Sequence, residues 1–227
     1  MFFRFFHKIP RISKGETMGF PILPFFLIFL IWLAIRIKTL DAKQEQQEAE
    51  FWAKEKAAKA TPAKDISNLR YITIPIEKFP LNFSNDEKVI EIETELKELS
   101  THKLLNLSGI SNTDLKLTYG TSNFEIMSQI GEDFDRACIL LNSYAKALIE
   151  AGREDDAVNV LEFAIGVGTD ISDSYVMLSD CYKKRSQTEK LSFLRERILN
   201  SDLLLKNSIL NKIDDSTEEN FSTSSPE

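Results

Sequence analysis

The stretch YAKALIEAGREDDAVNVLEFA, residues 144–164, decides the fold that this sequence predicts. Small Ala145 and Ala157 would let two helices approach closely, and larger apolar side chains would fill the space around them. Gly152 favours a left-handed cap at the end of a first helix, and the acidic run 154–156 suits the start of a second. The stretch therefore predicts an antiparallel helix pair. The residues expected to pack it are Tyr144, Ala145, Leu148, Gly152, Ala157, Leu161 and Ala164.

The same pattern recurs about 34 residues further along the chain. The corresponding positions are Leu178, Ser179, Tyr182, Ser186, Leu191, Arg195 and Ile198. Size and polarity agree at most of them, but Leu191 stands where a small residue belongs and Arg195 where a bulky apolar one does. Between Cys138 and Asn200 the chain thus resembles the tetratricopeptide-repeat family, with a degenerate second unit.

This resemblance implies a small α-solenoid whose concave face binds peptides or partner proteins, and it identifies no ligand. The candidate groove residues, on the first helix of each unit, are Asn142, Lys146, Val176, Asp180 and Lys183. Two repeats are fewer than the roughly three that a stable stack needs. We therefore expect helices at 86–100 and 121–131, with the segment around Tyr71, to cap the first unit, and a helix at 188–212 to close the far end.

Near the N-terminus, residues 20–35 (FPILPFFLIFLIWLAI) form an uninterrupted apolar run. With its flanks, this run approaches the ~20 residues needed to cross a bilayer core. A cleaved signal peptide would need a small-residue cleavage site, and none follows Ala34. We therefore predict an uncleaved transmembrane anchor at 18–38, with residues 20–35 in contact with lipid and Trp32 near one interface.

The orientation of this anchor depends on where the chain starts. Basic residues flank both sides of the apolar run, so the positive-inside comparison is nearly even. The codons for residues 14–16 can contain a purine-rich ribosome-binding sequence, which suggests that translation begins at Met18. The alternative is that residues 1–17 form a basic, aromatic arm on the membrane surface. A start at Met18 leaves only the C-terminal basic flank and predicts that residues 36–227 lie in the cytoplasm.

The segments that follow the anchor differ from one another in composition. Residues 39–62 consist of strong helix formers and predict a solvated helix. Residues 63–84 are β-branched and interrupted by prolines, which predicts an extended arm lying on the helices that follow; a peptide-like occupant of a binding groove is the alternative. Residues 85–213 predict the helical domain, and the acidic, Ser-rich residues 214–227 predict a disordered tail.

Composition and motifs argue against several classes of function. The formal net charge is −7, without a basic stripe, which disfavours nucleic-acid binding. Cys138 and Cys181 form no CxxC pair and are expected to be buried thiols. The only histidines are His7 and His102, which makes a metal site or a histidine-dependent catalytic centre improbable. We therefore expect no enzyme, no cofactor and no small-molecule substrate.

The whole layout also resembles a family of bacterial single-span membrane proteins with a C-terminal repeat pair, to which no activity is assigned. The resembling features are the anchor, the DISNLRYITIP arm at residues 65–75, NTDLK at 112–116, and the repeats. The expected fold is all-α, with one transmembrane helix, a short extended arm and a small repeat domain. The expected function is a membrane-anchored adaptor for an unidentified protein partner; the alternative is an accessory or chaperone-like subunit of a secretion or envelope complex.

Overall fold

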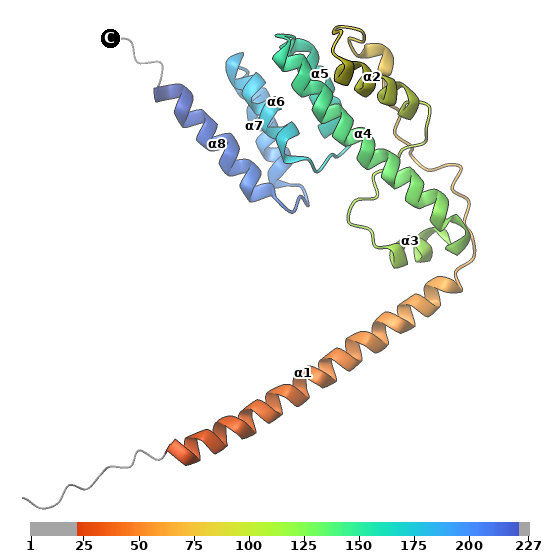
Figure 1. The fold of residues 1–227 in the computed structure, drawn as a ribbon, viewed down its shortest axis with the longest axis vertical. Helices are drawn as coiled ribbons and strands as arrows, with labels where there is room; N and C mark the ends of the chain where they lie inside the picture. The colour runs from red at the N-terminus through yellow and green to blue at the C-terminus, as the bar shows by residue number, and fades with distance from the viewer. Residues whose placement is uncertain (1–21, 223–227) are drawn as a thin grey trace, which may run out of the picture. The chain divides into compact units, whose positions relative to one another are not determined.

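A computed structural model describes residues 22–222, and this part of the chain is built from α-helices without a β-strand (Figure 1). The predicted all-α class is thereby confirmed. The helices are α1 (Ile22–Lys59), α2 (Glu87–Leu99), α3 (Asn112–Tyr119), α4 (Phe124–Glu150), α5 (Glu154–Gly166), α6 (Ser172–Lys184), α7 (Thr188–Leu199) and α8 (Lys206–Ser222). Short 3₁₀ helices occur at Ile76–Lys78 and Thr121–Asn123.

The chain divides into two compact units, residues 1–56 and 57–227. In the first, α1 forms one continuous helix, and every large apolar side chain from Phe25 to Leu40 is exposed. None of the helices among residues 22–222 has a stretch that is both long and apolar enough to cross a membrane. The predicted arm at 1–17 and residues 18–21 of the predicted anchor lie outside the described residues. Helix α1 ends at Lys59, shortly before Pro62.

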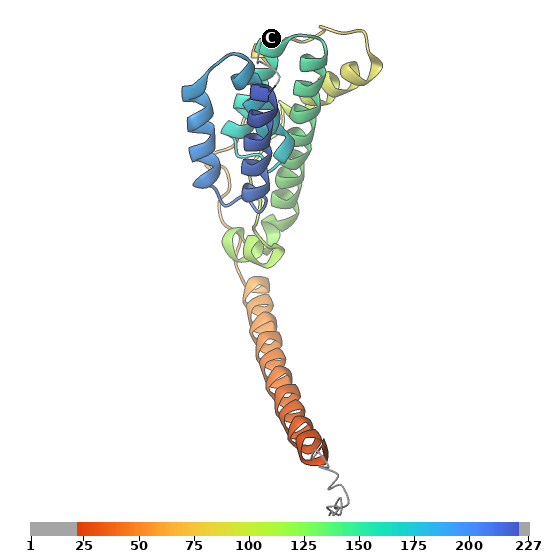
Figure 2. The same ribbon diagram turned by 90° about the vertical axis from the view of Figure 1, so that its left-hand side faces the viewer.

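Helix α4 forms the centre of the second unit. It packs against α2 and α3, and against α5 and α6. Helix α6 in turn contacts α5, α7 and α8, so the chain from α4 to α8 forms a stack of neighbouring helices (Figures 1 and 2). One apolar core joins these helices and includes the fully buried Leu141, Leu161 and Ile198. The burial of such side chains is the main favourable contribution to folding.

The segment before α2 lies against this core as an extended arm. Ile72 makes an isolated antiparallel bridge with Leu104, and Ile74 and Phe79 are buried. The ring of Phe79 contacts Tyr144 of α4 and Phe163 of α5, with centroids 6.4 and 6.0 Å apart. Aromatic pairs at such separations add to the stability gained from burial.

A buried carboxylate fixes the end of the arm. Both oxygens of Glu93 accept from the backbone N–H of Asn82, at 3.0 and 2.8 Å, and Asn82 has a positive φ of 59°. The Tyr144 hydroxyl donates to the Pro80 carbonyl at 3.0 Å and lies 3.3 Å from Glu93 Oε1. A buried charge is tolerable when hydrogen bonds replace its hydration, so this network attaches the arm to α2 and α4 in one register.

The start of the arm is attached at Gly120. This glycine has φ 90° and ψ 150°, a conformation that other residues rarely adopt. A Cβ at Gly120 would lie 2.4 Å from the Pro62 carbonyl oxygen. Next to it, Thr121 Oγ1 donates to the Ala58 carbonyl at 2.9 Å, and the Lys64 N–H donates to Tyr119 O at 3.0 Å.

The C-terminal end differs from the sequence prediction in two ways. The helix expected at 188–212 is interrupted at residues 200–205, and α8 continues through residue 222 into the segment predicted as a tail. Residues 223–227 lie outside the described part. Ile209 and Ile213, four positions apart, are both fully buried and give α8 one apolar face. The reversal at 200–205 lets this face return to the core, which a single straight helix could not do.

Candidate partner-binding groove

The two helix pairs share one cap geometry at equivalent positions. After α4, Gly152 has φ 73°, and the Arg153 N–H donates to the Leu148 carbonyl at 2.8 Å. After α6, Ser186 has φ 55°, and the Gln187 N–H donates to the Tyr182 carbonyl at 2.9 Å. Both are left-handed C-terminal caps with the same hydrogen-bond span. The repeat seen in the sequence therefore has a counterpart in backbone geometry.

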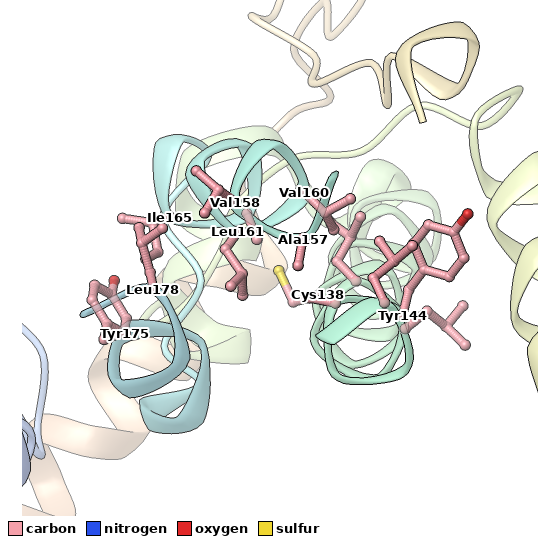
Figure 3. Packing of buried hydrophobic residues seen from close by; sticks show 14 of the residues in the cluster. Cys138, Tyr144, Ala157, Val158, Val160, Leu161, Ile165, Tyr175 and Leu178 are labelled. Atoms are coloured by element: carbon pink, nitrogen blue, oxygen red, sulfur yellow. The ribbon is translucent and has the colours of Figure 1, made fainter. Parts of the chain in front are cut away.

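Most of the residues expected to pack the pairs are buried between α4, α5 and α6, whereas Tyr144 packs against Phe79 and Phe83 of the arm. In Figure 3 the sulfur of Cys138 points from α4 toward Ala157 and Leu161 of α5. Because Cys138 and Ala157 are both small, the two helices can pack closely here. Among the residues expected to pack the pairs, those with at most 5% of their surface exposed are Tyr144, Ala145, Leu148, Ala157, Leu161, Ala164, Leu178 and Tyr182. Gly152 lies in the turn, where a Cβ would meet no atom within 4 Å.

The five candidate groove residues have different surroundings. Lys146 on α4 is exposed, whereas Val176 on α6 is half-buried. Asn142 accepts a hydrogen bond from the Ser174 hydroxyl at 2.8 Å, which links α4 to α6. One carboxylate oxygen of Asp180 is buried without a hydrogen-bond partner, and Lys183 donates to the Ile213 carbonyl of α8.

Helix α8 therefore covers the end of the surface that holds Lys183. Burial lowers the pKa of Lys183, an effect that nearby Asp180 opposes and Arg195 reinforces. The surface that remains open is the part around Asn142, Lys146 and Val176. The sequence could not separate these residues from Lys183, because only the docking of α8 distinguishes them.

Residues that sequence reasoning missed continue the open surface along α4. Asp135 and Ile139 precede Asn142 and Lys146 at spacings of four, three and four residues, so all four lie on one helix face. Both are exposed, and half of the Ile139 surface is accessible to solvent. This helical spacing was visible in the sequence and could have extended the candidate groove.

Ion pairs join the two helix pairs of the second unit. Glu154 accepts from Lys184 Nζ at 2.6 Å, and Asp155 pairs with Arg185 at 2.6 Å. The hydrogen bond from Lys184 lowers the pKa of Glu154. The acidic run 154–156 thus lies at the start of α5, as predicted, and also holds the end of α6.

The candidates for reactive or metal-binding chemistry are two buried cysteines and His102. Burial raises the pKa of the Cys138 thiol to about 11 and also raises the pKa of Cys181, so both thiols remain protonated and unreactive at neutral pH. His102 Nδ1 lies 2.8 Å from Asp133 Oδ2 on the surface. Within residues 22–222, no three His, Cys, Asp or Glu side chains are grouped to hold a metal ion.

Comparisons with family models, curated proteins and solved structures found no match to this chain.

Proposed function

We propose that this protein is a membrane-anchored helical-repeat adaptor, which binds a protein partner through the open surface on α4 and α6. The observation that carries the proposal is the paired cap geometry at Gly152 and Ser186. It gives α4–α5 and α6–α7 equivalent turns, and Asn142, Lys146 and Val176 belong to the first helices of these two pairs. Helical repeats use such extended faces to bind other proteins.

The exposed apolar surface of α1 supports the anchor. Residues 25–37 expose Phe, Leu, Ile and Trp side chains around the helix, with few polar positions between them. A helix that is apolar all round is stable when lipid or protein covers it. Tethering raises the local concentration of the repeat domain near the membrane, so weak binding of the partner suffices. We further propose that the repeat domain lies in the cytoplasm at the cell membrane, with Arg36 and Lys38 as the basic cytoplasmic flank of the anchor.

A site-specific crosslink in native membranes tests the binding surface. A photo-reactive amino acid replaces Lys146 in the open surface or, as a control, Lys97 on the exposed side of α2. The expected result is one defined crosslinked partner from position 146 and none from position 97. Identical products from both positions, or no product at all, would contradict an adaptor function.

Replacement of residues 20–35 with a generic membrane anchor separates two forms of the proposal. Retention of the crosslinked partner would show that the repeat domain binds it. Loss of the partner would favour an accessory subunit of a membrane complex, in which the aromatic side chains of α1 make specific contacts. Full release of the original chain from membranes by alkaline carbonate would contradict the anchor itself.

A further inference from the structure

Three loops of the second unit surround a hollow of about 530 Å³ at one end of the helical stack. They are the loops between α2 and α3, between α5 and α6, and between α7 and α8. Asn106 holds the first two together, since its Nδ2 donates to the Gly168 carbonyl at 2.8 Å. A second hollow of about 300 Å³ also borders on Ser108 and Gly109 and extends to α4. The two hollows thus share one wall.

Part of the rim of these hollows is apolar. Leu204 is completely exposed, Leu205 is 58% exposed, and both line the larger hollow. Ile110, 40% exposed, lines the smaller one. Exposed apolar side chains gathered around a hollow are typical of binding surfaces.

The charge at these hollows is mainly negative. Asp170 and Asp202 line the larger hollow, and Glu132 and Asp135 line the smaller one. Among the described residues, none of these four carboxylates forms an ion pair with a cationic side chain. Burial raises the pKa of Asp135, and the neighbouring charges of Asp170 and Glu132 raise it further.

The one cationic side chain in the larger hollow is already engaged. Arg197 Nη2 donates to the carbonyl oxygens of Ile165 and Gly166, at 2.6 and 3.1 Å. Its guanidinium therefore closes the C-terminal end of α5, where cations are favourable. These carbonyls are neutral, so Arg197 keeps its positive charge, but the four carboxylates that line the two hollows outnumber it and leave a net negative charge.

We propose that the two hollows form a docking site for a cationic segment of the partner protein that also carries apolar side chains. Leucine- or isoleucine-like side chains would enter between Leu204 and Leu205, and lysine or arginine side chains would face Asp170, Asp202 and Asp135. Charge complementarity selects this occupant over an acidic peptide, which the same carboxylates repel. The inference rests on the adaptor function and names the chemistry of its partner.

Selection from a library of short random peptides tests this site. The bait is the full-length chain in nanodiscs of uncharged phosphatidylcholine, with empty nanodiscs for counter-selection. We expect the selected peptides to be net cationic and to contain Leu, Ile or Phe. Their affinity should fall on raising the salt from about 0.05 to about 0.5 M, because counterions screen exposed charges.

Two variants locate the binding. Asp170→Asn combined with Asp202→Asn should weaken the selected peptides about tenfold, and Leu204→Ser should weaken them without changing their preference for positive charge. The matched control is Glu91→Gln with Glu98→Gln on the exposed side of α2, which should leave affinity unchanged. All three variants alter exposed side chains, and thermal unfolding checks that each one folds.

Three results would contradict the proposed docking site. These are enrichment of acidic or uncharged peptides, the absence of any selected peptide, or unchanged affinity in the Asp170/Asp202 variant. A dimer of this chain that the Asp170/Asp202 variant disrupts would identify a second copy as the occupant instead. If a partner is still crosslinked from position 146 but the selected peptides show no preference for positive charge, the proposed docking site is contradicted and the adaptor function is retained. If the selected peptides are cationic but no partner is crosslinked from position 146, the adaptor function is contradicted.

Discussion

Two glycines with positive φ have very different surroundings. Gly120 has φ 90° and ψ 150° and packs against the backbone of Pro62, whereas Gly152 has φ 73° and no atom within 4 Å of the position a Cβ would take. The sequence indicated Gly152 as a cap, because it follows a helical pattern. It gave no sign that Gly120 touches a segment almost sixty residues earlier, since that approach depends on the path of the arm.

The two positions therefore predict unequal costs for the same substitution. Gly152→Ala should cost about 1 kcal/mol of unfolding free energy, which is the strain of a left-handed alanine. Gly120→Ala adds a backbone clash to that strain and should cost about 3 kcal/mol or more. Urea unfolding of both variants measures the difference. Equal costs would show that the contact with Pro62 does not constrain the native backbone.

The buried thiol of Cys138 predicts a loss of stability at alkaline pH. Its pKa is raised to about 11 in the folded chain, from 9.0, so the unfolded thiol ionises first. The protonated thiol makes its full contribution to the free energy of unfolding below about pH 9. As the pH rises toward about 11, this free energy falls by about 1.4 kcal/mol per pH unit, up to about 3 kcal/mol in total. Burial also raises the pKa of Tyr144 and Tyr175, which adds to the loss.

Cys138→Ala isolates the contribution of the thiol. Urea unfolding near pH 8 and near pH 10.5 should show that the variant loses about 2 kcal/mol less than the original chain over this range. The readout is the change with pH, so the cost of the smaller side chain cancels. The same alkaline loss in both chains would mean that Cys138 is accessible to water in the native state.

Helix α8 is held to the rest of the second unit by tertiary contacts. Its isoleucines at 209 and 213 are fully buried, and Lys183 of α6 donates to the Ile213 carbonyl. The surrounding sequence is rich in Asp, Asn, Ser and Thr, which are poor helix formers. Composition alone therefore predicted a disordered tail from residue 214, whereas docking of the two isoleucines stabilises α8 up to Ile213, and the helix continues to Ser222.

Ile209→Ala should accordingly undock α8 and destabilise the second unit by about 2–4 kcal/mol. Hydrogen exchange should become faster at amides of α8 and at the end of α6 near Lys183. Leu204→Ala is the matched control, because Leu204 is completely exposed and its truncation should change stability by less than about 0.5 kcal/mol. Unchanged exchange in the Ile209 variant would show that α8 is not docked in solution.

The boundary between the two units predicts which fragment folds independently. Residues 57–227 form one compact unit that includes the buried Ala58, whose carbonyl accepts from Thr121. A chain of residues 57–227 should therefore unfold cooperatively, with the same midpoint in urea as the full-length protein. The comparison also shows whether the first unit contributes to the stability of the second.

A shorter fragment, residues 64–227, is the matched test. It lacks Ala58 and Pro62, so it loses the hydrogen bond at Thr121 and the packing at Gly120. We expect it to be about 1–2 kcal/mol less stable than the 57–227 fragment, because a buried hydrogen bond and a close backbone contact are both removed. Equal stability of the two fragments would place the boundary after residue 63.

The sequence by itself determined the helical class and the main helix pair. Helical periodicity, the small residues at 145 and 157 and the glycine at 152 are local signals, and they specify α4, α5 and the turn between them. The course of the arm, the break at 200–205 and the hollow between three loops were decided only by tertiary structure. Each depends on contacts between residues far apart in the chain, such as Glu93 with Asn82 and Tyr144, and Asn106 with Gly168. Such contacts form only where the packed core brings their partners together, so local sequence patterns do not encode them.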